Sequence, residues 1–123
     1  MIPIEPAHIV GTGGAIGAIL RQLASSRIDG TVYPYGTITV NVAGTFLLGS
    51  VTFLGMGNEL VLFLGTGVAG SFTTFSSFSV ETVRLWETGD RYRAVGNAAG
   101  TFLGALLALG AAWILTRALA QAL

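Results

Sequence analysis

The sequence predicts an all-α membrane protein, with four transmembrane helices forming a single domain over residues 1–123. Three observations support this fold class. The chain is 52% hydrophobic and only 10% charged, whereas soluble domains carry about 25% charged residues. Its mean hydropathy is +0.73. Its few charges also divide it into four apolar segments, each close to or longer than the roughly 20 residues that cross a bilayer.

The first expected span, residues 7–26, is apolar and Gly-rich, interrupted only by His8 and by Arg21 near its far end. The second, residues 36–57, carries no charge, and the stretch 27–35 between them has the charges and proline typical of a loop. Because the first basic residue is Arg21, the apolar start lacks the positive region of a signal peptide. We therefore expect it to belong to the mature protein.

The third expected span, residues 60–86, is free of charge over residues 60–80, and the fourth covers residues 94–116. The polar sequence RLWETGDRYR separates them and predicts a loop. The alternative is a soluble helical bundle, whose helices would each need a polar face. The second and fourth segments carry no charged stripe, so we prefer membrane spans.

The composition excludes several classes of function. The chain has no lysine, and six arginines balance six acids, so nucleic acid is not an expected partner. It has no cysteine and one histidine, which excludes a thiol nucleophile, a thiolate metal site and a catalytic triad. We expect a protein that is not an enzyme.

Arginine and glycine positions bear on topology and assembly. Three arginines flank one side of the expected membrane domain and one flanks the other: Arg27, Arg91 and Arg93 against Arg117. Such a weak bias is compatible with insertion in both orientations. Glycines recur every four residues at positions 13 and 17 and at 96, 100 and 104, which indicates close helix packing. Four short helices enclose little space, so an oligomer is expected.

The third span is expected to be broken near its middle. Gly65, Gly67 and Gly70 precede a cluster of Ser and Thr, a combination with poor intrinsic helix stability. A break would expose carbonyls of one half and N–H groups of the other, a recurring way to bind ions. The alternative is an unbroken helix whose hydroxyls bond carbonyls one turn back.

Three apolar segments contain candidate ion contacts. Asn41 lies inside the second span, either bonded to a neighbouring helix or donating to an anion in a pathway. Phe75 and Phe78 are one turn apart and could present positive ring edges to an anion, with plain packing as the alternative. Arg21 is expected to snorkel or pair near the interface, or less simply to attract anions in a vestibule.

Two further sets of polar residues share a helical face by their spacing: Thr74, Ser77 and Glu81, and Asn97 and Thr101. The second set could extend a polar track or bond to a neighbouring helix.

Three blocks of sequence resemble the family of small four-span fluoride channels called CrcB (camphor resistance) or Fluc. They are GGAIGAILR at 13–21, GTITVNVAGTFLLG at 36–49 and GVAGSFTTFSSF at 67–78. The resemblance covers nearly the whole chain. The chain departs from the family pattern at three positions. Gln22 stands where an aromatic is common, Ser71 stands where a glycine is common, and Ser77 replaces a threonine but keeps the hydroxyl.

The resemblance implies an antiparallel, dual-topology homodimer in the bacterial inner membrane, with two fluoride pathways and a structural sodium ion at the dimer centre. The implied pathway residues are Asn41, Phe75, Ser76, Ser77, Phe78 and Thr101. Gly70 and Thr73 would offer backbone carbonyls to sodium, and Arg21 would lie towards a vestibule or interface. The implied function is passive, selective export of fluoride from the cytoplasm, which lowers its toxicity.

Two functions other than fluoride export fit the sequence less well. A small dual-topology multidrug exporter should carry a membrane-embedded carboxylate in its first span, and here that region has only Glu5 at its extreme start. A non-conducting membrane-anchor subunit would explain the glycines but not the combination of Asn41 with TTFSSF.

Overall fold

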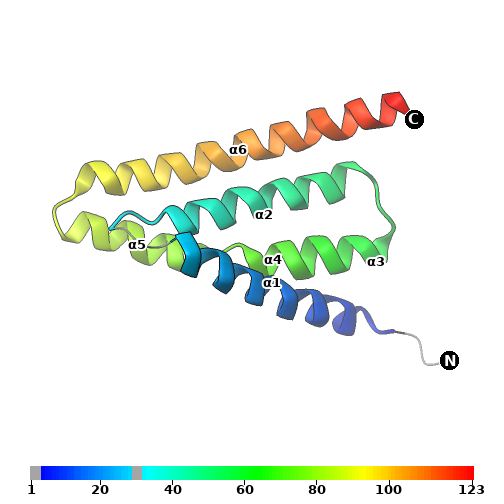
Figure 1. Cartoon of the computed structure of the whole chain (residues 1–123), viewed down its shortest axis with the longest axis horizontal. Helices are drawn as coiled ribbons and strands as arrows, with labels where there is room; N and C mark the ends of the chain where they lie inside the picture. Colours follow the sequence, from blue (N-terminus) through cyan, green and yellow to red (C-terminus); the bar gives the residue numbers. More distant parts are fainter. Residues whose placement is uncertain (1–3, 29–31) are drawn as a thin grey trace.

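The computed structural model describes residues 4–28 and 32–123, and within these ranges it contains helices and no strand (Figure 1). The elements are α1 (Pro6–Ile28), α2 (Tyr35–Phe53), α3 (Asn58–Leu60), η1 (Val61–Ala69), α4 (Gly70–Phe72), α5 (Phe75–Glu87) and α6 (Arg91–Ala122). α3, η1 and α4 follow one another without interruption, and η1 has the wider turn of a π-helix. The all-α prediction is confirmed.

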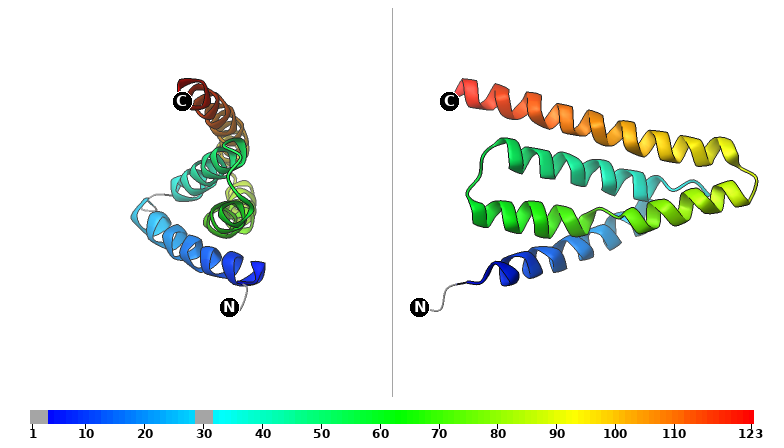
Figure 2. Two further views of the ribbon diagram at one scale, coloured as in Figure 1. Left: turned by 90° about the vertical axis from the view of Figure 1, so that its right-hand side faces the viewer. Right: turned by 180° about the vertical axis from the view of Figure 1, so that it is seen from behind.

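The helices form an elongated, thin bundle (Figure 2). α2 packs along α6, and α1 packs along η1 and α4. The rod of α3, η1 and α4, continued by α5, runs antiparallel to α2 and α6. The two termini lie at the same end of the molecule, opposite the turn between α5 and α6 (Figure 1).

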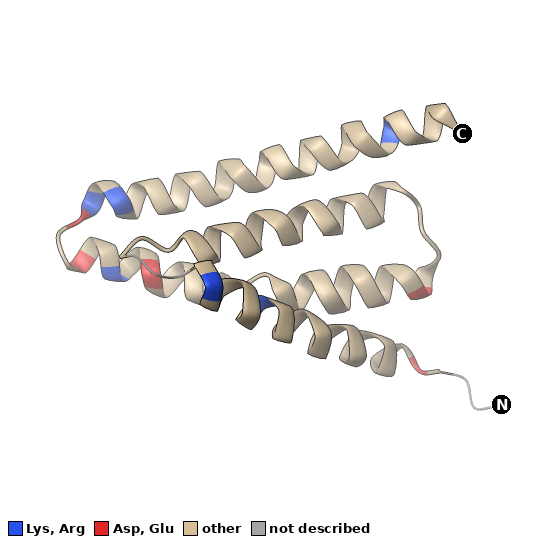
Figure 3. Ribbon diagram, viewed as in Figure 1, with Lys and Arg blue, Asp and Glu red and all other residues tan. Residues whose placement is uncertain are grey.

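Three described segments are long and apolar enough to cross a membrane: Tyr35–Phe53, Asn58–Glu87 and Arg91–Ala122. α1 coincides with the first expected span at 7–26 and has 23 residues, but its glycines and arginines make it less apolar than these three. Its crossing of the membrane therefore stays a prediction. Acidic and basic residues gather mainly towards the two ends of the bundle, as a membrane protein requires (Figure 3).

Two helix boundaries differ from the expected spans. α2 ends at Phe53, four residues short of 57, because the chain turns at Gly55, whose φ is +63°. α6 runs beyond both ends of 94–116, and at its start the Asp90 side chain caps the helix by accepting from the Arg93 N–H at 3.3 Å. Its 32 residues correspond to about 48 Å at 1.5 Å per residue, so its ends extend past the hydrocarbon.

The first glycine stripe packs as predicted. A Cβ added at Gly13 would overlap the carbonyl oxygen of Phe63, and one at Gly17 would overlap that of Val68. The backbones of α1 and η1 therefore touch directly, as small residues allow in membrane proteins. The second stripe is only partly used within the chain: a Cβ added at Gly104 would meet Val42, but one added at Gly100 would meet nothing within 4 Å among the described residues outside its own helix backbone.

Candidate functional site

The third expected span is interrupted, as predicted, three residues after Gly70. α4 ends at Phe72, Thr73 and Thr74 have extended backbone with ψ of 159° and 115°, and α5 begins at Phe75. Thr74 caps α5, because its Oγ1 accepts from the Ser77 N–H at 3.2 Å. The same Oγ1 lies 3.1 Å from the Ser77 hydroxyl. The Ser/Thr cluster thus stabilises the second half-helix from its first turn.

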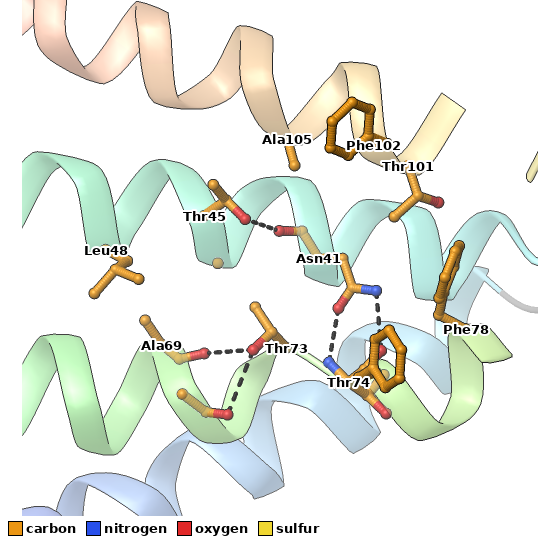
Figure 4. Close-up of a pocket in the computed structure, with 13 residues that line it drawn as sticks. Asn41, Thr45, Leu48, Ala69, Thr73, Thr74, Phe78, Thr101, Phe102 and Ala105 are labelled. Carbon is orange, nitrogen blue, oxygen red and sulfur yellow. Dashed lines mark hydrogen bonds between the residues drawn. The ribbon is translucent and has the colours of Figure 1, made fainter. Parts of the chain in front are cut away.

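Asn41, on α2, bonds both backbone groups of Thr74 (Figure 4). Its Nδ2 donates to the Thr74 carbonyl at 3.0 Å, and its Oδ1 accepts from the Thr74 N–H at 2.7 Å. This pair of bonds satisfies backbone groups that would otherwise be costly inside a membrane. The interhelical interpretation of Asn41 is confirmed. Its role as an anion donor stays a prediction, for which one Nδ2 hydrogen remains.

Arg21, on α1, also reaches the break. Its Nη1 donates to the Thr73 carbonyl at 3.3 Å in a partly buried position. The expectation that Arg21 pairs with another group is confirmed, and the partner is the interrupted backbone rather than an acid. Its implied place in a vestibule or interface stays a prediction.

The break borders a pocket of about 380 Å³. Six of the nine predicted site residues line it: Asn41, Gly70, Thr73, Phe75, Phe78 and Thr101. Figure 4 shows Thr101 and Phe102 on α6 across from Thr73 and Thr74. The rings of Phe75 and Phe78 are 5.9 Å apart, and Phe75 is 79% exposed. The pocket therefore collects residues from α2, η1, α4, α5 and α6, and no charged side chain is among its lining residues.

Ser76, Ser77 and Arg21 do not line this pocket. The two serine hydroxyls lie beside it, Ser76 Oγ at 3.4 Å from Thr74 Oγ1. Thr101 is 8% exposed, and its hydroxyl has no hydrogen-bond partner among the described residues. A buried hydroxyl without a partner costs about 1–3 kcal/mol, so Thr101 Oγ1 is an unused hydrogen-bonding group beside the pocket.

More polar contacts continue from the pocket towards the α5–α6 turn. Thr37 Oγ1 donates to Glu81 Oε1 at 2.8 Å, and Asn97 Nδ2 donates to Thr82 Oγ1 at 2.8 Å. Asn97 is fully buried, and its Oδ1 has no partner within the part of the chain that the structure describes. Asn97 therefore does bond a neighbouring helix. The sequence alone did not identify Thr37 and Thr82, because single threonines in apolar segments give no spacing signal.

A second pocket, of about 460 Å³, lies at this end of the molecule and is lined by Val32, Tyr33, Tyr35 and Arg93. The pKa of Tyr33 is raised, first by burial and then by Tyr35. Its phenol therefore stays protonated near neutral pH.

The two backbone carbonyls implied for sodium fit a hard cation. In a continuous helix the Gly70 carbonyl would accept from the Thr74 N–H and the Thr73 carbonyl from the Ser77 N–H. Here those donors are used by Asn41 Oδ1 and Thr74 Oγ1. Neutral carbonyl oxygens of this kind replace water around alkali ions. No cluster of His, Cys, Asp or Glu suited to a metal occurs among residues 4–28 and 32–123.

Residues 8–113 match the family model described as CrcB-like protein, Camphor Resistance (CrcB). The chain is 50% identical over 117 residues to the fluoride-specific ion channel FluC 2 of Haloarcula marismortui, covering 95% of this chain and 98% of the relative. It is 46% identical to FluC 1 of Halobacterium salinarum, over 89% and 92% of the two chains. It is 41% identical to FluC of Mesorhizobium japonicum, over 82% and 87%.

Proposed function

The chain belongs to the CrcB family of fluoride-specific ion channels, and from this premise we propose that it conducts fluoride passively and selectively out of the cytoplasm. Such export lowers the toxicity of fluoride to the cell. The chain is a multi-pass membrane protein and a channel rather than an enzyme. We further propose that α1 also crosses the membrane, which gives four spans in total. An even number of spans agrees with the two termini lying at one end.

The observation that carries the proposal is the uncharged, largely apolar pocket at the helix break, which has a few hydrogen-bonding groups such as Asn41 and Thr101 in its lining. Fluoride is small and strongly hydrated, so a pathway must replace part of its water shell. The edges of Phe75 and Phe78 carry positive partial charge, and the Thr101 hydroxyl has no partner among the described residues. An uncharged lining suits conduction, because an ion must leave as readily as it enters.

The remaining pathway residues act beside the pocket. Asn41 holds the break through Thr74 and keeps one amide hydrogen for the anion. Ser76 and Ser77 add hydroxyls at the start of α5, next to Thr74. Arg21, which bonds the Thr73 carbonyl, brings positive charge close to the route without lining it.

We propose an antiparallel, dual-topology homodimer with a structural sodium ion at its centre. In a single chain two of the residues that line the pocket are largely exposed, Phe75 to 79% and Phe102 to 64%. Gly100, on the same helix as Phe102, has open space beside it. A second copy packed on this face would close the pocket. Gly70 and Thr73 would hold the sodium through their carbonyls, and the ion would supply a positive charge that fixes the interrupted helices of the two copies.

The proposed location is the cytoplasmic membrane, the bacterial inner membrane in a bacterial host. Growth on fluoride tests the cellular role. Cells that lack their own fluoride exporter should grow at higher fluoride concentrations when they express this chain. Expression at the membrane without any gain in resistance would contradict the proposal and favour a membrane-anchor subunit.

A further inference from the structure

Arg21 brings a full positive charge to the interrupted backbone. Its Nη1 lies 3.3 Å from the Thr73 carbonyl oxygen, which is 52 positions away in sequence. The ion pair found among the described residues joins Arg93 to Asp90, so no carboxylate there lies within 4 Å of the Arg21 guanidinium. Within residues 4–28 and 32–123, the charge of Arg21 is therefore compensated by backbone oxygen and not by an acid.

The same carbonyl is one of the two oxygens proposed to hold sodium. Its helical donor, the Ser77 N–H, bonds Thr74 Oγ1 instead. A carbonyl oxygen has two lone pairs, so it could accept from a guanidinium and contact an ion at once. Two positive charges on one oxygen nevertheless repel each other, and this repulsion grows where water is excluded.

We propose that Arg21 is a tethered cation that competes with the metal ion for the Thr73 carbonyl and thereby lowers the affinity of the break for sodium. This inference depends on the proposed sodium site. When the ion is absent, the guanidinium keeps the Thr73 carbonyl bonded and the break folded. Because the repulsion doubles for a doubly charged ion, Arg21 also disfavours divalent cations, which prefer oxygen ligands.

The test is a thermal-unfolding titration of the purified protein with NaCl, using N-methylglucamine chloride to hold ionic strength constant. Arg21→Gln keeps an N–H donor but removes the charge, and it should lower the half-saturating sodium concentration roughly tenfold or more. Arg21→Lys, which keeps the charge, and Arg27→Gln, on an exposed residue of the same helix, should titrate like the parent. An unchanged or weaker sodium response in Arg21→Gln overturns the proposal.

If Arg21→Gln does not fold, a second measurement on the parent protein tests the proposal. Sodium should raise its unfolding midpoint more than magnesium does at equal concentration, and an equal or larger effect of magnesium overturns the proposal. Absence of any sodium response in parent and variant overturns it too. These titrations do not require conduction. Fluoride release by the parent protein in liposomes tests the channel function separately, so the failure of one proposal can be told from the failure of the other.

Discussion

Asn41 and Thr74 form a two-point pair in which one side-chain amide bonds both backbone groups of the residue at the helix break. Asn41 Nδ2 lies 3.0 Å from the Thr74 carbonyl oxygen, and Asn41 Oδ1 lies 2.7 Å from the Thr74 backbone nitrogen. The amide behaves as a peptide unit supplied by α2. By taking the Thr74 N–H, it also releases the Gly70 carbonyl from its helical donor. The pair therefore links the stability of the break to the chemistry offered beside it.

Replacing Asn41 with Ala should destabilise the protein by about 1–3 kcal/mol, because both groups of Thr74 lose their partner. Thermal unfolding in detergent measures this change. Thr39→Ala, on the same helix, removes an exposed hydroxyl that bonds its own helix at Tyr35, and should change stability by less than about 0.5 kcal/mol. Equal effects of the two substitutions would refute the bridging role.

Phe75→Ile and Phe78→Ile should reduce fluoride flux while the dimer stays assembled, because an aliphatic side chain fills space but offers no positive ring edge. Flux from liposomes and the elution volume in size-exclusion chromatography measure the two properties. Phe46→Ile provides the control, since Phe46 is an exposed phenylalanine of α2 outside the pocket. Undiminished flux in both pocket variants would reject the aromatic role.

Thr101→Val should lower fluoride flux roughly tenfold, the loss expected for one hydrogen bond of about 1.5 kcal/mol, while Thr101→Ser should retain most of the flux. Valine conserves the volume and removes only the hydroxyl. Thr116→Val is the matched control, because Thr116 is also buried in α6 but bonds the Trp113 carbonyl. Equal flux in Thr101→Val and in the parent would show that the hydroxyl does not contact the ion.

Gly17→Ala should destabilise the packing of α1 on η1, typically by about 1–3 kcal/mol, since the new methyl group would overlap the Val68 carbonyl. Gly11→Ala in the same helix has open space around its new methyl group. It should stabilise the protein by up to about 1 kcal/mol through helix propensity. Thermal unfolding compares the two, and a stabilising effect of Gly17→Ala would contradict the direct backbone contact.

The sequence predicted the helix break but not how it is held. Glycines followed by Ser and Thr indicate weak helix stability locally, and the chain indeed leaves the helix at Thr73 and Thr74. The partners of the break, Asn41 and Arg21, come from other helices, and single-chain periodicity does not encode which faces meet. The bond from Arg21 to a carbonyl was missed for this reason.

Three of the four segments expected from hydropathy are helices long and apolar enough to cross a membrane, but hydropathy did not predict where the helices end. Charged residues can continue a helix outside the hydrocarbon, as α6 does, and the positive φ of Gly55 ends α2 before its apolar stretch is finished. The π-helical turn of η1 was also not foreseen. Its carbonyls at Phe63 and Val68 face the glycines of α1, so its form is tied to a tertiary contact that local sequence does not reveal.

Fluoride release from liposomes reconstituted with the pure protein measures the proposed conduction itself. A fluoride electrode and a parallel chloride electrode would follow both anions after the potassium gradient is discharged with valinomycin. A selective fluoride channel should release fluoride rapidly and retain chloride. Release of neither anion by assembled, folded protein, or release of both at similar rates, would contradict the proposed function.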